Sequence, residues 1–262
     1  MRPLPDPRLR AVAHRMADAA RAAILPHFRT PLAVESKAEG FDPVTVADRA
    51  GEAAMRAVLS DARPDDAVLG EEAGAAAGTS GLTWVLDPID GTRGFISGTP
   101  TWGVLVGLRD AEGPLLGLVD QPFTGERFAG DAAGATWTRG EERRALAVRE
   151  TEALAEATIL TTFPEVGTPE EGAAFRRVAG RCRLTRYGMD CYAYALLAAG
   201  HVDLVVEAGL HAYDIAGPLA LVEAAGGVVT AWDGGSALDG GTCVAAATPA
   251  LHAAALEALE WT

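Results

Sequence analysis

The chain has 262 residues, of which 49% are hydrophobic, and its formal net charge is −14 at pH 7. This length fits one large domain or two closely packed halves. A protein this acidic is a poor partner for nucleic acid or an anionic membrane, because both are bound through Lys and Arg. A small anionic substrate is not excluded, since a bound divalent cation can invert the local charge.

The cysteines and the N-terminal segment indicate the compartment. Cys182, Cys191 and Cys243 have a spacing that matches no zinc-binding pattern, and we interpret them as buried thiols in a reducing cytoplasm. Residues 1–20 carry charged side chains throughout, unlike a signal peptide. No apolar run reaches the length of about 18 residues that a membrane-spanning helix needs. We therefore expect a cytoplasmic protein.

The first half predicts two helices followed by a sheet. Residues 7–28 place apolar side chains near the helical period of about 3.6 residues, and residues 46–60 form a second expected helix with Thr45 as its N-cap. Short apolar runs bounded by Gly, Asp or Pro then predict strands at 67–70, 82–86, 102–108 and 115–119. Loops rather than long helices separate these runs, so we expect a mixed or antiparallel sheet.

The second half alternates strands with helices, which indicates an α/β arrangement. Strands are expected at 158–161, 203–207, 228–231 and 243–246, and helices at 169–180, 189–199, 213–225 and from Thr248 onward. Pro249 occupies the first position of the last helix, which suits its fixed backbone. A charged run at 139–157 marks a soft boundary. We interpret the chain as one domain, 1–262, with halves at 1–145 and 146–262.

Carboxylates gather where apolar segments begin or end. They are Asp48, Glu71, Glu72, Asp87, Asp90 and Asp214. The clearest pair is Asp87 and Asp90 in the stretch DPIDGT, where Pro88 fixes the backbone of an expected turn that aims both side chains at one point. Two converging carboxylates repel one another unless a cation lies between them. Mg²⁺ prefers such hard oxygen ligands.

The residues that follow this pair suit a phosphate. Gly91 lets the backbone approach a ligand closely, and free amides at a helix start favour an anion. Each acidic cluster alone has an ordinary structural explanation, as a turn cap, a solvated charged face or an N-cap. Their joint occurrence in one chain favours a site that holds a metal and the phosphate that it polarises.

A covalent aspartyl-phosphate route is disfavoured. Phosphatases of the haloacid-dehalogenase type carry a DxDGT motif near the N-terminus, and its first Asp is the nucleophile. Asp87 and Asp90 lie three positions apart, a third of the way along the chain. We therefore expect direct attack by water.

Three blocks of this sequence resemble the signature blocks of the inositol monophosphatase family: WVLDPIDGTRGF at 84–95, LGEEAG at 69–74 and AYDIAGPLALVEAAGG at 212–227. Lys37 and the segment 42–48 resemble the family's N-terminal block. The resemblance implies an α/β (α+β) fold, the layered αβαβα sandwich shared with fructose-1,6-bisphosphatase. It also implies a homodimer and Mg²⁺-dependent hydrolysis of a small phosphorylated metabolite, with two or three ions that Mn²⁺ can replace.

The same resemblance assigns roles to individual residues. The implied metal ligands are Glu71, Asp87, the carbonyl of Ile89, Asp90 and Asp214. Thr92, with Asp48 or Glu71, is implied to orient the attacking water, and the amides around Gly91 and Thr92 are implied to contact the phosphate. Glu72 and Lys37 are expected beside these groups.

The segments GTRGFISGTPTWG at 91–103 and RYGMDCYAYALLAAG at 186–200 resemble the histidinol-phosphatase branch of the family, although Gly94 and Met189 depart from its usual Ala and Gly. Arg186, Asp190 and Glu207 are expected at the substrate. The two carboxylates suit the ammonium and imidazole groups of L-histidinol phosphate, whereas inositol has no cation. The alternative for Asp190 is a simple helix cap.

Several functions stay open at this point. The first is hydrolysis of L-histidinol phosphate in histidine biosynthesis, and the second is the same chemistry on inositol 1-phosphate or a broad set of metabolites. A regulatory binding protein without turnover is disfavoured because every expected metal ligand is present. A bisphosphate-nucleotide phosphatase is also disfavoured, because this sequence shows no basic cluster that could bind a second phosphate.

Overall fold

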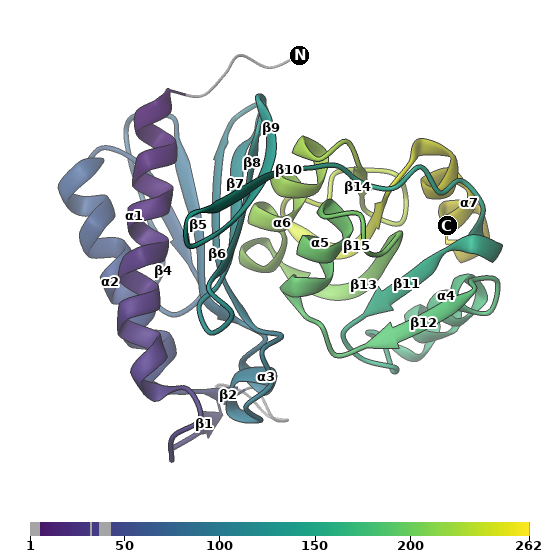
Figure 1. Cartoon of the computed structure of the whole chain (residues 1–262), viewed down its shortest axis with the longest axis horizontal. Helices are drawn as coiled ribbons and strands as arrows, with labels where there is room; N and C mark the ends of the chain where they lie inside the picture. The colour runs from purple at the N-terminus through teal and green to yellow at the C-terminus, as the bar shows by residue number, and fades with distance from the viewer. Residues whose placement is uncertain (1–5, 32, 37–42, 262) are drawn as a thin grey trace.

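The computed structural model describes residues 6–31, 33–36 and 43–261. Two sheets alternate with three helical layers, and Figure 1 shows these layers side by side, from α1 and α2 at the left to α4 and α7 at the right. The expected layered αβαβα sandwich is confirmed. Among the described helices, none combines the length and the apolar character that crossing a bilayer requires.

The outer layer at the left consists of two long amphipathic helices. Helix α1 spans Pro7–Ile24 and continues into the 3₁₀ turn η1 (Leu25–His27), and α2 spans Val46–Ala62. Both expected helices are confirmed, and Thr45 is the N-cap of α2, because its side chain accepts a hydrogen bond from the amide of Ala47. Beside them, β1 (Glu35–Ser36) and β2 (Pro43–Val44) form a small antiparallel pair.

An eight-stranded sheet forms the second layer, in the order β10-β9-β8-β7-β6-β5-β3-β4. Its strands are β3 (Ala67–Gly70), β4 (Gly74–Ala76), β5 (Thr83–Asp90), β6 (Gly103–Asp110), β7 (Gly113–Gln121), β8 (Glu126–Asp131), β9 (Gly134–Arg139) and β10 (Glu142–Leu146), and the short helix α3 (Thr92–Ile96) follows β5. Neighbouring strands are antiparallel except for the parallel pair of β3 and β5. The expected mixed sheet is confirmed.

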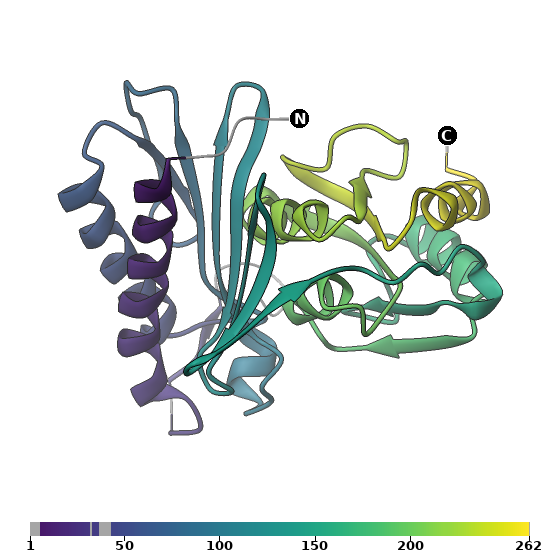
Figure 2. The same ribbon diagram turned by 45° about the horizontal axis from the view of Figure 1, so that its top comes forward.

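The second sheet has five strands in the order β12-β11-β13-β15-β14. Its strands are β11 (Thr158–Thr161), β12 (Leu184–Tyr187), β13 (Leu204–His211), β14 (Val228–Thr230) and β15 (Gly240–Ala246). The elements around it are η2 (Leu154–Glu156), α4 (Pro169–Ala179), α5 (Cys191–Ala198), α6 (Ala212–Ala224) and α7 (Pro249–Leu259). Helices α5 and α6 lie between the two sheets, and α4 and α7 cover the outer face (Figure 2).

Helix α6 contacts the first sheet without intervening side chains. Gly107, Gly117 and Gly130 lie opposite one another on β6, β7 and β8. A Cβ atom on Gly117 would lie only 2.0 Å from the carbonyl oxygen of Gly217 in α6. Backbone therefore packs directly on backbone here, and the first turn of α6, which carries Asp214, is held beside the first sheet.

Candidate active site

The centre of the site is an irregular end of strand β5. The pairing of β5 with β6 shifts between Asp87, which lies opposite Leu105, and Asp90, which lies opposite Gly103. In a regular strand, residues three apart point to opposite faces, and a bulge with one extra residue removes that opposition. The expected turn at Pro88 is therefore wrong in form, because the segment remains within the strand. The expected convergence of the two carboxylates is nevertheless present.

Three carboxylates meet at this point. Asp87, Asp90 and Asp214 each place an oxygen within 4.8 Å of the others. The backbone N–H of Ile89 donates to Asp87 Oδ1 over 2.9 Å, and the N–H of His211 donates to Asp214 Oδ2 over 2.7 Å. Both acids are thus fixed by their own local backbone.

The electrostatics of the cluster fit a cation. Burial raises the pKa of Asp87 well above its usual value, and the charges of Glu71, Asp90 and Asp214 raise it further. Burial, followed by the charges of Asp214 and Asp190, raises the pKa of Asp90 in the same way. Anionic oxygens that oppose one another's ionisation are a donor set that a hard divalent ion would stabilise.

Glu71 reaches the cluster from the neighbouring strand. The parallel register of β3 and β5 places Gly70 opposite Leu86, and the N–H of Glu71 donates to the carbonyl of Leu86. Glu71 consequently lies beside Asp87, whose pKa its charge raises. Glu72 is the next residue of the turn that joins β3 to β4. Lys37 lies outside the described residues.

Asp48 and Thr92 form a hydrogen-bonded pair next to the cluster. The Thr92 hydroxyl lies 3.3 Å from Asp48 Oδ1 and 3.1 Å from the carbonyl oxygen of Ile89, and can donate to either. Asp48 is fully buried, and its Oδ2 accepts from both the amide and the hydroxyl of Thr45. Burial raises the pKa of Asp48, against the lowering effect of these hydrogen bonds.

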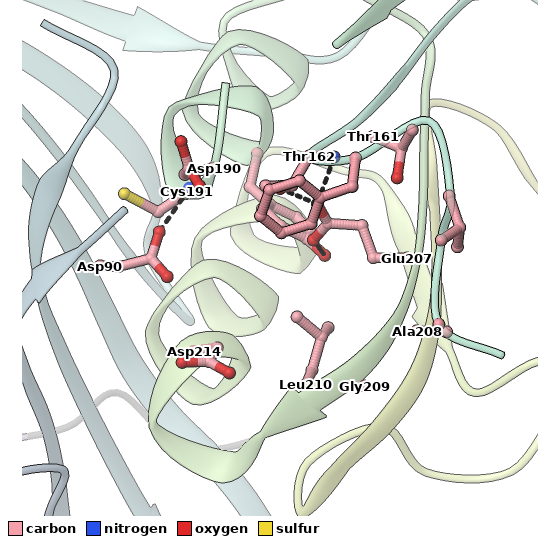
Figure 3. Close-up of a pocket in the computed structure, with 14 residues that line it drawn as sticks. Asp90, Thr161, Thr162, Asp190, Cys191, Glu207, Ala208, Gly209, Leu210 and Asp214 are labelled. Carbon is pink, nitrogen blue, oxygen red and sulfur yellow. Dashed lines mark hydrogen bonds between the residues drawn. The ribbon is translucent and has the colours of Figure 1, made fainter. Parts of the chain in front are cut away.

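A cavity of about 190 Å³ opens beside the carboxylate cluster (Figure 3). Asp90 and Asp214 lie on one side of it, and Thr162 and Glu207 lie on the other. Its wall is therefore contributed by the end of β5, the first turn of α6 and the ends of β11 and β13. A phosphate held at the carboxylate cluster would project its organic part into this space.

Asp190 lies in the same cavity, directly before helix α5. Asp190 occupies the N-cap position of α5, as the alternative interpretation expects, but its side chain makes no capping hydrogen bond to the helix. Asp90 supplies that contact, since its Oδ2 accepts from the N–H of Cys191 over 2.6 Å. Burial, together with the charge of Glu207, raises the pKa of Asp190 to about 7.

Gly91 is required where Asp190 approaches. Its backbone has φ of 84°, in the left-handed region that favours glycine. A Cβ atom on Gly91 would lie 2.9 Å from the Cβ of Asp190. The start of α3 and the start of α5 thus pack against each other at the edge of the site.

Glu207 forms part of the cavity floor. Its Oε1 accepts hydrogen bonds from the amide and the hydroxyl of Thr162, at 3.0 and 2.5 Å, and its Oε2 accepts from the Tyr194 hydroxyl at 2.8 Å. Burial raises the pKa of Glu207, while these donors oppose the rise. Sequence reasoning missed Thr162 and Tyr194. The available signal was that Thr162 directly follows a strand, where site residues often lie.

Arg186 lies apart from the cavity, whereas Phe163 lies in its wall. Arg186 is exposed on the edge strand β12, opposite Leu160, and it is not among the described residues that line the cavity. Phe163, which does line it, is 42% exposed and carries the guanidinium of Arg93 over its ring at 4.7 Å. Sequence reasoning missed this pair, which joins α3 to the loop after β11.

The layered fold and the carboxylate cluster together define a class, the phosphatases of the αβαβα type. Within it, residues 7–261 match the model of the inositol monophosphatase family, and the chain belongs to that family. Members of this family are phosphomonoesterases that depend on metal ions.

Relatives carry three kinds of name: bifunctional phosphatase, histidinol-phosphatase and inositol monophosphatase. The bifunctional phosphatase IMPL2, chloroplastic, of Arabidopsis thaliana is 38% identical over 265 residues, which cover 97% of this chain and 75% of that protein. The histidinol-phosphatase of Streptomyces coelicolor is 39% identical over 234 residues, 85% of this chain and 86% of the relative. The solved structure of an inositol monophosphatase from Zymomonas mobilis has a TM-score of 0.85 at 39% identity and covers 96% of this chain and 97% of that one.

Proposed function

We propose that this chain is a Mg²⁺-dependent phosphatase that hydrolyses L-histidinol phosphate to L-histidinol and phosphate. The observation that carries the proposal is the position of Asp190, a partly buried carboxylate that lines the same cavity as Asp90 and Asp214. A substrate whose phosphate lies at the cluster would bring its organic part within reach of Asp190. A cationic group there would pair with the carboxylate.

The metal ligands in this proposal are Glu71, Asp87, the Ile89 carbonyl, Asp90 and Asp214. Two or three Mg²⁺ ions, or Mn²⁺ in their place, would fit this set of hard oxygen donors. Such ions lower the pKa of a bound water and offset the charge that develops on a transferring phosphoryl group.

Thr92 and Asp48 orient the attacking water in this mechanism. With its own proton directed to Asp48, the Thr92 hydroxyl oxygen can accept a hydrogen bond from the water. Asp48 is itself held by Thr45 and cannot rotate away without breaking two hydrogen bonds. The amides around Gly91 and Thr92 would contact the phosphate oxygens, so the chain binds and aligns both reactants.

Asp190 and Glu207 act at the organic end of the substrate. Glu207 already accepts three hydrogen bonds, so we assign it to shaping the floor and to the negative potential of the cavity. Asp190 is the direct partner of the substrate ammonium. An adjacent cation would favour its ionised form, in opposition to the burial that raises its pKa. Arg186, which is not among the described residues that line the cavity, is proposed to contribute to substrate binding from the edge strand β12.

The second candidate is inositol 1-phosphate or a broad set of small phosphate esters. It is favoured by the Zymomonas mobilis inositol monophosphatase, which matches this chain at the same 39% identity as the Streptomyces coelicolor histidinol-phosphatase. We also propose that the chain is one domain, that it is cytoplasmic and that it works as a homodimer. The mass of the native protein in solution would test the homodimer.

The test compares kcat/KM for L-histidinol phosphate and myo-inositol 1-phosphate in the wild type and in Asp190→Asn. A charge-assisted hydrogen bond to an ammonium contributes about 1.5–3 kcal/mol, or about ten- to a hundredfold in rate. We expect the wild type to prefer L-histidinol phosphate and the variant to lose that preference. Equal losses on both substrates would remove Asp190 from substrate recognition and favour the second candidate.

A further inference from the structure

The turn that carries Glu71 is held by a buried carboxylate that the proposed mechanism does not use. Glu71 is the first residue of the turn between β3 and β4, which spans residues 71–73. A metal ligand on a short turn contributes to affinity only if the turn keeps one conformation, because ordering it on binding costs conformational entropy. The groups that fix this turn therefore bear on the site.

Glu52 lies beneath the turn, in the middle of α2. Its side chain is 1% exposed. Its Oε2 accepts from the amide of Glu72 over 2.6 Å, and its Oε1 accepts from the amide of Ala73 over 3.1 Å. One carboxylate thus binds two successive amides of the turn, directly after Glu71.

Arg56 completes the arrangement from the next turn of α2. Its Nε donates to Glu52 Oε1 over 2.6 Å, and its Nη2 donates to the carbonyl of Gly74 on the far side of the turn. The contact is tight, since a Cβ atom on Gly70 would lie 2.3 Å from Glu52 Oε1. The pair therefore binds three successive residues after Glu71, from Glu72 to Gly74, to α2, the helix whose first turn also presents Asp48.

We propose that Glu52, supported by Arg56, is a positioning residue that holds Glu71 in the orientation needed for metal binding. This inference rests on the proposed role of Glu71 as a metal ligand. A carboxylate suits the task because it only accepts hydrogen bonds. A glutamine of the same shape would turn an N–H₂ group towards one of the donors that Glu52 now satisfies.

The first experiment measures metal binding without turnover. Mn²⁺ binding to the metal-free protein is followed by titration calorimetry, for the wild type and for Glu52→Gln. Loss of a partner that orients a ligand weakens metal binding by about ten- to a hundredfold, and we expect a loss in that range. At saturating Mg²⁺, kcat of the variant should return to within a few-fold of the wild type, because Glu52 touches neither substrate nor ion.

The second readout is amide exchange in the metal-free protein, measured residue by residue by NMR. We expect the amides of Glu72 and Ala73 to exchange at least about tenfold faster in Glu52→Gln, since a broken hydrogen bond opens them locally. Unchanged exchange, or Mn²⁺ binding within twofold of the wild type, would overturn the inference.

A matched control separates positioning from general destabilisation. Asp66 directly precedes β3, is fully buried in its side chain, and pairs with Arg63 as Glu52 pairs with Arg56. Asp66→Asn therefore makes the same chemical change at the other end of the same strand. It should lower the melting temperature but leave Mn²⁺ affinity unchanged. A comparable loss of affinity in Asp66→Asn would reduce the role of Glu52 to stability.

Glu71→Gln distinguishes failure of this inference from failure of the proposed function. If Glu71→Gln leaves Mn²⁺ binding unchanged, Glu71 is not a ligand and the metal assignment itself is wrong. If Glu71→Gln weakens binding while Glu52→Gln does not, only the positioning role of Glu52 fails.

Discussion

Asp90 Oδ2 accepts a hydrogen bond of 2.6 Å from the backbone N–H of Cys191, so a carboxylate of the first sheet caps a helix that lies between the two sheets. Asp190 is the residue immediately before Cys191 and packs against Gly91, which immediately follows Asp90. The proposed metal end and the proposed substrate end of the site are therefore tied together by direct contacts. A change that moves Asp90 would also move Asp190.

Asp87→Asn should abolish turnover and leave the fold intact. The substitution removes one charge from the centre of the carboxylate cluster with little change in shape. We expect kcat to fall by at least about a hundredfold, which corresponds to about 2.7 kcal/mol in the barrier. Circular dichroism checks the fold, and phosphate release measures the rate. A variant that keeps a tenth of the wild-type rate would show that Asp87 is no metal ligand.

The metal-free protein should lose stability as the pH rises. A carboxyl group whose pKa is higher in the folded than in the unfolded chain favours folding at low pH, and this contribution disappears as the pH rises through the raised value. Asp87 and Asp90 are shifted in this direction, and the pKa of Asp190 reaches about 7. For Asp190 the loss should begin near the ordinary carboxyl pKa of 3.8 and extend to about pH 7, and Asp87 and Asp90 should add to it in the same direction.

This pH effect is measured as melting temperature against pH, with chelator and with Mg²⁺. Added Mg²⁺ should restore the stability lost towards neutral pH, because it compensates the ionised carboxylates. The double variant Asp87→Asn, Asp90→Asn should show a flatter profile without metal. If the double variant keeps the wild-type slope, the repulsion inferred from the cluster is not the cause.

Thr92→Val should impair the chemical step more than metal binding. Valine keeps the shape of the side chain but removes the hydroxyl that contacts Asp48. Loss of a side chain that positions or transfers a proton lowers the rate by about a hundred- to ten-thousandfold. We expect kcat of Thr92→Val to fall within that range. Thr99→Val is the control, because Thr99 lies exposed after α3 and bonds to Gly94 and Thr101. A similar loss in both variants would exclude a specific role for Thr92.

Gly117→Ala should displace α6 and, with it, Asp214. The added methyl group would meet the Gly217 carbonyl at 2.0 Å, and relieving such overpacking costs about 1–3 kcal/mol. We expect a lower melting temperature and a higher Mg²⁺ concentration for half-maximal activity. Leu118→Val, on the opposite face of β7 and packed in the core beneath α1, should lower stability without changing the Mg²⁺ requirement. Equal Mg²⁺ requirements in both variants would contradict a link between this contact and the site.

Strongly patterned elements were predictable from the sequence, and weakly patterned ones were not. The helical period identified α1 and α2, and Thr45 was correctly expected as an N-cap because its hydroxyl can satisfy a free amide. Strands β8, β9 and β10 were missed. Their residues are mostly polar and only partly buried, so alternation of apolar side chains is weak. Pairing with a neighbouring strand, rather than local propensity, decides their conformation.

The same distinction between strong and weak sequence patterns applies to the features of the candidate site. Asp87, Asp90 and Asp214 were identified because carboxylates at the ends of apolar segments are conspicuous. The bulge at Pro88 was not identified, because a proline between two acids is equally typical of a turn. Only the pairing of β5 with β6 shows the shift in register between Asp87 and Asp90. The contact of Asp90 with Cys191 joins residues 101 positions apart, and no local pattern predicts such a contact.

The position of Asp214 in the chain has a consequence for synthesis. The expected ligands Asp87 and Asp90 belong to the first sheet and Glu71 to a turn between two of its strands, whereas Asp214 enters only with α6, after 213 of the 262 residues. Chains emerge from the ribosome N-terminus first, and their parts begin to fold in that order. A nascent chain would thus contain three of the four acidic residues of the proposed metal site long before Asp214 could complete that site. If Asp214 is a metal ligand as proposed, a chain that terminates before residue 214 would be inactive rather than partly active.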